Sequence, residues 1–351
     1  MALKFFKLFS NCLLVKGKLR SLICDVQLQD YQLIPNSLFE ILTKFPDKSV
    51  EEIKAFYNNE FDETINEYLD FLIQKEHIFY CEKEELELFP EMDLIWDNPA
   101  IITNAIVDID KNSSHNFNEI INQFESLGTK HFQLRCYEIK PLSFFEGILN
   151  ELEERAILSV EFIIKSSEET NLESLEILTD KFPRLHNLIV HSSNENKIAK
   201  VDSTKIGNII YTSQVIDNQS HCGFISPDYF SINIQTFTES QKHNTCLNRK
   251  ISIDVNGEIK NCPSMTKSYG NIRDTTLKEA IEKPGFKDMW FIHKDQIEVC
   301  KDCEFRHICT DCRAYIQDQS NIYSKPAKCS YDPYTATWGE DNPTNNPLHG
   351  K

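Results

Sequence analysis

The sequence predicts an α/β protein in which a partial β/α barrel lies between a small amino-terminal domain and a cysteine-rich carboxy-terminal segment. Two observations predict this order. Apolar strands alternate with amphipathic helices from Pro99 to about Thr212, and seven of the twelve cysteines fall between Cys246 and Cys329. The 351 residues are enough for about two to three domains with a buried core.

Residues 1–90 have the order of elements of a small winged-helix domain. Residues 5–24 are expected to form a hairpin of two strands, and residues 31–34 a third strand. Three helices are expected next, the second starting at the capping box Ser49-Val50-Glu51-Glu52. A short strand at 76–81 completes the domain. The apolar face of the third helix is expected to carry Ile65, Leu69, Leu72 and Ile73.

This order of elements resembles the leader-recognition domain of peptide-modifying enzymes, the fold of the PqqD-like proteins. An unpaired strand edge beside a helix can take up an extended peptide as a further strand. A plain winged-helix module that packs against its neighbour is the alternative. DNA binding is disfavoured by the net charge of −17, because phosphate contacts need clustered Lys and Arg. The candidate peptide contacts are Tyr31, Gln32, Leu33 and Tyr68.

Residues 95–240 are expected to form the partial barrel. Its strands are nearly continuous in apolar residues, which is typical of a parallel sheet covered by helices. In such barrels the chemistry lies on the loops after the strands. The loop from Asp108 to His115 contains no cysteine, and Cys136, at the end of the next strand, is interpreted as a small buried hydrophobe. The expected strands are 101–109, 131–137, 157–164, 186–190 and 207–211.

Glycine is scarce in this chain, which has only ten. No two glycines are spaced as in a G-x-G-x-x-G turn or a P-loop. These motifs cradle the phosphates of nucleotides. The chain is therefore not expected to be the nucleotide-using partner of any reaction.

Residues 241–333 contain the cysteine array. It consists of Cys246-x10-Gly257-x4-Cys262, then Cys300-x2-Cys303-x5-Cys309-x2-Cys312, and finally Cys329. Closely spaced sulfurs can reach one ion or cluster from a tight turn, and distant sulfurs complete the ligand shell. Seven thiolates are too many for one tetrahedral site and nearly enough for two. The spacing alone does not separate zinc from iron and sulfide.

A partial barrel followed by this array resembles a radical S-adenosylmethionine enzyme with a SPASM domain, which binds auxiliary 4Fe-4S clusters. The resemblance implies one or two clusters, with zinc as the alternative metal. The second would be held by Cys300, Cys303, Cys309 and Cys329. The first is assigned Cys246, Cys262 and Cys312, and its fourth ligand stays open between Cys222, His243, a substrate group and none.

The catalytic motif of radical enzymes, C-x3-C-x2-C after the first barrel strand, is absent. No three of the remaining cysteines have that spacing, so we assign this chain no S-adenosylmethionine site and no catalytic residue. The Gly-Gly-Glu that usually follows the second strand is missing as well. The remaining cysteines are Cys12, Cys24, Cys81, Cys136 and Cys222.

One family combines a SPASM domain with a missing radical motif: the peptide maturases of the grasp-with-spasm systems. The run from Cys303 to Ala314 is similar to that family's signature. The resemblance implies an accessory protein that matures a ribosomally synthesised peptide, with a precursor peptide and an ATP-grasp ligase as partners. Two alternatives stay open, a radical enzyme with unrecognised cluster ligands and a zinc-stabilised peptide-binding module.

The ends of the chain bear on its location. Lys4 and Lys7 interrupt the apolar start, and no small-residue cleavage site follows it, so no export signal is predicted. No run of eighteen apolar residues occurs, which predicts no membrane span. We therefore expect a cytoplasmic protein with free thiols. Residues 334–351 are rich in Asn, Pro and Thr and are expected to form a flexible tail.

Overall fold

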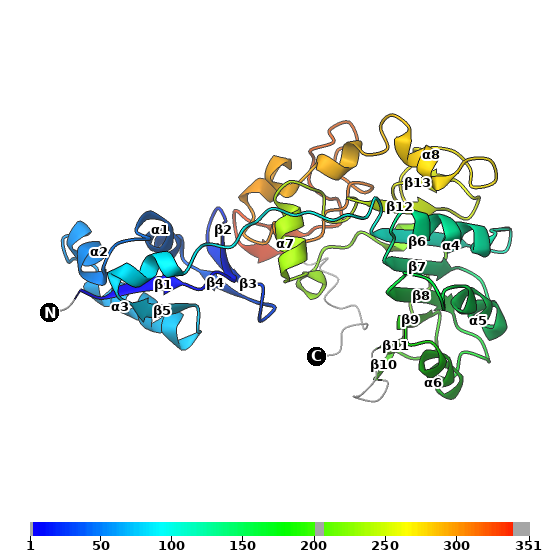
Figure 1. The fold of residues 1–351 in the computed structure, drawn as a ribbon, viewed down its shortest axis with the longest axis horizontal. Helices are drawn as coiled ribbons and strands as arrows, with labels where there is room; N and C mark the ends of the chain where they lie inside the picture. The colour runs from blue at the N-terminus through cyan, green and yellow to red at the C-terminus, as the bar shows by residue number, and fades with distance from the viewer. Residues whose placement is uncertain (1–2, 201–206, 340–351) are drawn as a thin grey trace.

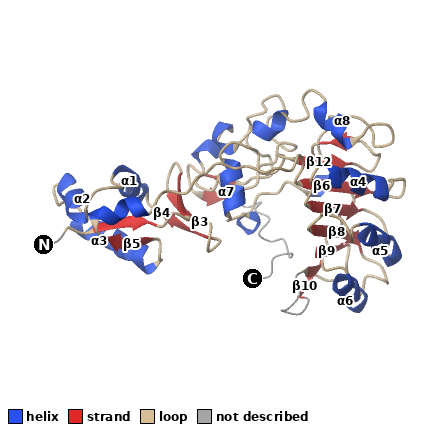
Figure 2. Cartoon of the chain, viewed as in Figure 1, coloured by secondary structure: helices blue, strands red, loops and turns tan. Residues whose placement is uncertain are grey.

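The computed structural model describes residues 3–200 and 207–339. Figure 1 shows three parts in a row, with the amino-terminal domain at one end and a helix-covered sheet at the other. The cysteine-rich segment lies between them. Figure 2 shows that this middle part is mostly loop, so its structure depends on side-chain contacts more than on regular hydrogen-bond ladders.

The amino-terminal domain combines two small sheets with three helices. The predicted hairpin over 5–24 is only partly correct. Residues 12–16 pair with residues 21–25 as expected, but residues 5–8 pair antiparallel with residues 78–81 at the end of the domain. The capping box at Ser49 is confirmed, since its side chain accepts from the amide of Glu52. The elements are β1 (Phe5–Leu8), β2 (Cys12–Lys16), β3 (Ser21–Asp25), β4 (Asp30–Ile34), α1 (Asn36–Lys44), α2 (Val50–Phe56), α3 (Asp62–Gln74) and β5 (Ile78–Cys81).

Strands β2, β3 and β4 form one antiparallel sheet in that order. Their apolar side chains pack on the helices, whose buried residues include Ile65, Leu69 and Leu72 of α3. Ile73, expected on the same face, is 37% exposed, because its position lies at the edge of that stripe. Within this sheet β4 is an edge strand, paired on one side only.

The predicted parallel sheet is confirmed as an open sheet of eight strands, in the order β10-β11-β9-β8-β7-β6-β12-β13. Helices α4, α5 and α6 cover one face (Figure 1). Six of these strands, β6, β7, β8, β9, β11 and β12, run parallel to one another. The elements are β6 (Asn104–Ile109), α4 (Phe117–Ser126), β7 (His131–Cys136), α5 (Leu142–Glu151), β8 (Ser159–Lys165), α6 (Leu172–Lys181), β9 (Leu185–His191), β10 (Lys197–Lys200) and β11 (Asn208–Tyr211).

The cysteine-rich segment is continuous with this sheet. The hairpin expected around Gly257 forms, and its first strand adds to the sheet beside β6. Ile251, Ile253 and Ile259 of this hairpin are buried in the same core as the barrel strands. The remaining elements are α7 (Ile234–Ser240), β12 (Lys250–Ile253), β13 (Ile259–Lys260), α8 (Leu277–Glu282), β14 (Tyr331–Asp332) and β15 (Thr337–Trp338).

The amino-terminal domain is docked on the cysteine-rich segment through the β2–β3 turn. Arg20 Nε lies 2.6 Å from Glu304 Oε1, and the amide of Lys18 donates to the carbonyl of Asp302 at 2.8 Å. Gly17 lies against Glu304, because a Cβ there would come within 2.9 Å of the Glu304 Cβ. The contact therefore joins the first domain to the loop between two array cysteines.

The tail predicted over 334–351 is described only as far as residue 339. Within that part, β15 pairs with β14, and Trp338 contacts Tyr331 with ring centroids 4.9 Å apart. Residues 340–351 lie outside the described part. None of the described helices has the length and apolar character that a bilayer crossing requires.

Candidate metal centres

Four cysteines meet on the face of the sheet opposite to the helices that cover it. Cys246 lies just before β12 and Cys262 just after β13, so the hairpin brings these two thiols together. Cys312 and Cys222 lie beside them. Cys246 is close enough to raise the pKa of Cys312, and Cys262 hydrogen-bonds the sulfur of Cys222. We call Cys222, Cys246, Cys262 and Cys312 the first cysteine group. All four line a cavity of about 720 Å³ between the sheet and the cysteine-rich segment.

Cys222 is the member whose role the sequence leaves open. The Cys262 thiol hydrogen-bonds its sulfur and, with Ser264 and Arg135, outweighs the effect of burial, lowering the pKa of Cys222 to about 5. The same hydrogen bond and burial raise the pKa of Cys262. Thiolates are the form of cysteine that binds metal. His243, the other candidate, lies between the rings of Trp96 and Phe291, at centroid distances of 5.4 and 5.6 Å.

Gly223 allows the close approach of Cys222 to Cys312. Its φ is +85°, in the left-handed region that glycine adopts without strain. A Cβ at this position would lie 2.9 Å from Cys312 Sγ. The residue after Cys222 therefore has both a conformational and a steric reason to be glycine.

The other four array cysteines form the second cysteine group: Cys300, Cys303, Cys309 and Cys329. Burial and the neighbouring thiols raise the pKa of Cys309 to about 12. Burial and Cys329 raise the pKa of Cys300, and burial and Cys309 raise the pKa of Cys303. None of the four is among the residues lining the 720 Å³ cavity. Three of them, Cys303, Cys309 and Cys329, pack instead with Val15, Leu22 and Cys24 of the amino-terminal domain.

Each cysteine group has one lysine directed at a sulfur. Lys250 Nζ lies 3.4 Å from Cys246 Sγ, and Lys294 Nζ lies 3.4 Å from Cys309 Sγ. Lys294 is 4% exposed, and burial alone would lower its pKa, but Cys309, Cys300 and Asp311 raise it well above its usual range. Buried ammonium groups need a nearby negative charge. Both lysines therefore fit an anionic metal-thiolate centre, and no sequence spacing pointed to Lys294.

In neither cysteine group, as far as the structure describes the chain, do three sulfurs lie as close together as the ligands of a single zinc ion. Zn–S bonds of about 2.3 Å place tetrahedral sulfurs about 3.8 Å apart. In the described part of the chain, only Cys12, Asp25 and His77 bring three ligand atoms within 4.8 Å of one another. The donor set of each group, four cysteines, is that of a cubane cluster. The residues present thus fit an iron-sulfur cluster.

A buried polar network lies beside the first group, at the ends of β6 and β7. Both oxygens of Asp108 accept from Arg135, at 2.6 and 2.7 Å, and Tyr137 donates to Asp108 at 2.8 Å. Burial alone would lower the pKa of Arg135, but Asp108 raises it. His115 also contacts this region, with Nε2 3.0 Å from the Asp108 carbonyl oxygen.

The candidate peptide contacts lie on β4 and α3. Leu33 is 38% exposed, and Gln32 and Tyr68 are partly buried, with Tyr68 Oη 2.8 Å from Ser37 Oγ. Tyr31 is in a different environment. Its ring packs edge-on against Phe305 and Phe230 of the cysteine-rich segment, which anchors this end of β4 to the neighbouring segment.

The four cysteines outside the two groups are scattered. Cys12, Cys24 and Cys81 lie in the amino-terminal domain, and Cys136 ends β7. Cys136 is fully buried and its sulfur lies 3.1 Å from the Glu138 carbonyl oxygen, as expected of a small hydrophobe. The loop after β6 holds no cysteine.

Three comparisons with known proteins bear on these centres. No curated protein matches the sequence. Among solved structures, the chain is similar to SuiB of Streptococcus suis bound to S-adenosylmethionine, with 10% identity and a TM-score of 0.38, over 92% of this chain and 99% of that chain. SuiB bound to its precursor peptide SuiA gives the same identity and TM-score, over 93% of this chain and 100% of that chain.

The family comparison covers the first part of the array. The model of the SPASM family, an iron-sulfur cluster-binding domain, matches residues 245–304. This segment contains Cys246, Cys262, Cys300 and Cys303, two cysteines from each group. The chain therefore contains a SPASM domain, as its cysteine spacing predicts.

Proposed function

We propose that this chain is an accessory maturation protein for a ribosomally synthesised, post-translationally modified peptide. It binds the precursor peptide, carries two 4Fe-4S clusters and works beside an ATP-grasp ligase. The observation that supports the proposal is the pair of four-cysteine groups, each with its own lysine, of which the SPASM match at residues 245–304 covers two cysteines in each group.

The two clusters have different roles in this proposal. The first group lines the 720 Å³ cavity in front of the sheet, so its cluster faces the space that a peptide side chain can enter. The second group packs against the amino-terminal domain, so its cluster holds the two parts together. Metal-thiolate binding contributes on the order of 10 kcal/mol to the folding of small domains, which is sufficient for the second role.

Iron and sulfide are favoured over zinc by the spacing of the sulfurs. Four thiolates bound to one zinc ion lie less than about 4.8 Å from one another. In neither group, as described, do three ligand atoms lie that close together. Cys222 completes the first group in our proposal, because it shares a hydrogen bond with Cys262 and is easily ionised.

The precursor adds to the free edge of β4. That strand pairs only with β3 in its sheet, and a peptide added there gains main-chain hydrogen bonds while side chains at alternate positions give specificity. Leu33 is the exposed apolar residue of this strand. The ligase partner rests on the similarity of the run from Cys303 to Ala314 to the grasp-with-spasm signature.

Calorimetry with the precursor peptide encoded next to this protein tests the proposal. We expect binding, alone or with the ligase present, and at least about tenfold weaker binding by Leu33→Asp, since burying a leucine contributes about 1.5 to 3 kcal/mol. Leu28→Asp is the matched control, because Leu28 is 64% exposed and lies outside β4. No binding under either condition contradicts the proposal.

An incubation with S-adenosylmethionine and reductant separates the accessory role from radical catalysis. The chain's remaining cysteines are scattered, so we expect no 5′-deoxyadenosine above background from anaerobically reconstituted protein. Formation of 5′-deoxyadenosine would identify a radical enzyme with unrecognised ligands and replace the accessory role.

A further inference from the structure

A second kind of metal-binding arrangement lies in the amino-terminal domain, away from both cysteine groups. The thiol of Cys12, the carboxylate of Asp25 and the imidazole of His77 are all buried, with exposed fractions of 2, 2 and 5%. Their ligand atoms all lie within 4.8 Å of one another. Cys12 starts β2, Asp25 ends β3 directly opposite to it, and His77 immediately precedes β5.

The distances match those around a tetrahedral zinc ion. Cys12 Sγ lies 3.6 Å from His77 Nδ1 and 3.8 Å from Asp25 Oδ2. With Zn–S near 2.3 Å and Zn–N or Zn–O near 2.1 Å, tetrahedral angles place the sulfur about 3.6 Å from each of the other two ligand atoms. The three side chains thus stand where zinc ligands stand.

The hydrogen bonds around these three groups leave one buried ring nitrogen of His77 without a partner. The Cys12 thiol has one proton but faces both an imidazole nitrogen and a carboxylate oxygen. Asp25 Oδ1 accepts from Asn11 and from the amides of Gln27 and Leu28. All these donors are neutral and bind Oδ1, which leaves Oδ2 with the thiol. The ring of His77 has a buried Nε2 without a partner.

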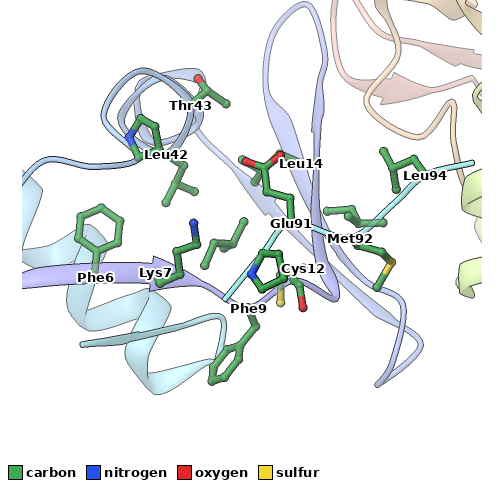
Figure 3. Close-up of a pocket in the computed structure, with 15 residues that line it drawn as sticks. Phe6, Lys7, Phe9, Cys12, Leu14, Leu42, Thr43, Glu91, Met92 and Leu94 are labelled. Carbon is green, nitrogen blue, oxygen red and sulfur yellow. The ribbon is translucent and has the colours of Figure 1, made fainter. Parts of the chain in front are cut away.

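We propose that Cys12, Asp25 and His77 bind a zinc ion through three protein ligands. Such three-ligand sites keep a fourth position for water or another group. Cys12 also lines a cavity of about 300 Å³ between β1, β2, the end of α1 and the segment around Met92 (Figure 3). Cys12 is the one of the three ligands that lines this cavity.

The zinc ion joins the two sheets of the domain. Cys12 and Asp25 belong to the three-stranded sheet, whereas His77 leads into the two-stranded sheet of β1 and β5. The site thereby fixes the base of the sheet whose edge strand is β4. The inference stands apart from the proposed peptide function, because it depends only on the three ligands.

Elemental analysis of the full-length protein, purified anaerobically with its clusters and exposed to zinc, tests the site. We expect one retained zinc per chain, and at least about tenfold weaker zinc binding by Cys12→Ser and by His77→Asn, because losing even an outer-shell partner of a ligand costs about 10- to 100-fold. Iron and sulfide should be unchanged in both variants. This readout separates the zinc site from zinc bound to the SPASM cysteines.

Cys24→Ala is the matched control, since Cys24 is a fully buried cysteine beside Asp25 that belongs to a different core cluster. It should retain the zinc. If the ligand variants fail to fold, cobalt titration of the wild-type protein decides, with the sulfur-to-cobalt charge-transfer band of a tetrahedral site expected. Absence of that band, or equal zinc in the wild type and the folded ligand variants, contradicts the proposal.

Discussion

One buried lysine, Lys294, lies beside the second cysteine group. Lys294 is buried, and its ammonium lies between Cys309 Sγ, at 3.4 Å, and Asp311 Oδ1, at 4.0 Å. Cys309, Cys300 and Asp311 raise the pKa of this ammonium group. Because nearby positive charge stabilises the reduced, more negative form of a cluster, we expect this lysine to raise the reduction potential of a cluster bound by the second group.

Lys294→Met tests this role. We expect the reduction potential of the second cluster to fall, by about 59 mV for each 1.4 kcal/mol of lost interaction in a one-electron step. Redox titration followed by electron paramagnetic resonance measures the change. Lys301→Met is the control, because Lys301 is exposed although it follows Cys300. Equal potentials in Lys294→Met and the wild type would show that the lysine is not coupled to the cluster.

Glu239 gives the protein a pH-dependent stability. Burial raises the pKa of Glu239 from 4.5 to about 7, against the hydrogen bond that it accepts from Asn248. The folded state therefore holds a proton that the unfolded chain releases between these values. Stability is unaffected below pH 4.5, falls as the pH rises, and stays low above pH 7.

Glu239→Gln removes this dependence while keeping an acceptor for Asn248. At pH 8 we expect the variant to exceed the wild type in its free energy of unfolding by about 2 to 3 kcal/mol. The two proteins should be alike at pH 4. Denaturant unfolding at both pH values measures the difference, and a gain that is equal at the two pH values would rule out the titration of Glu239 as its cause.

Sequence patterns predicted the local elements well and the long-range pairings poorly. The capping box at Ser49 and the turn at Gly257 depend on neighbouring residues, and both form as expected. The pairing of β1 with β5 and of β12 with β6 joins strands far apart in the sequence. Apolar periodicity shows that a strand exists but not which strand it pairs with.

The candidate site shows the same limit. Cysteine spacing predicted seven candidate ligands because closely spaced thiols are rare by chance. Cys222 has no near neighbour in the sequence, and only the fold brings it to Cys262. Lys294 and Arg135 are recognised by burial and by what they contact, and a lysine or arginine in sequence is by default a solvated side chain.

The segment that carries Cys222 depends on the glycine that follows. Gly223→Ala places a methyl group 2.9 Å from Cys312 Sγ and strains a φ of +85°. We expect this variant to lose iron from the first centre and to keep the second. Iron and sulfide analysis with Mössbauer spectroscopy measures the loss.

Gly147→Ala is the control for that prediction, because a Cβ on Gly147, in α5, meets nothing within 4 Å. It should keep both centres and gain about 0.5 to 1 kcal/mol of helix stability. Full iron content in Gly223→Ala would show that the segment can move away from Cys312 without losing the cluster.

The whole molecule is held in an extended arrangement by contacts between its parts (Figure 1). The β2–β3 turn meets the loop between Cys303 and Cys309, where Glu304 is 1% exposed and paired with Arg20. Cys303 and Cys309, which flank this loop, belong to the second cysteine group. Loss of the second cluster is therefore expected to free the amino-terminal domain as well.

Gly17→Ala tests the docking directly. Its Cβ would lie 2.4 Å from the Arg20 carbonyl oxygen and 2.9 Å from the backbone of Glu304. We expect a larger radius of gyration by X-ray scattering and faster proteolysis of the connecting residues 90–99, with both clusters retained. An unchanged radius and an unchanged cleavage rate would contradict this account of the interface.

The two cysteine groups are expected to bind iron-sulfur clusters, and metal analysis of the anaerobically purified chain measures what they hold. Two 4Fe-4S clusters predict about eight iron atoms and about eight sulfides per chain, with Cys222→Ser losing iron from the first centre only. About two zinc ions per chain and no sulfide would contradict this expectation and make the array a zinc scaffold.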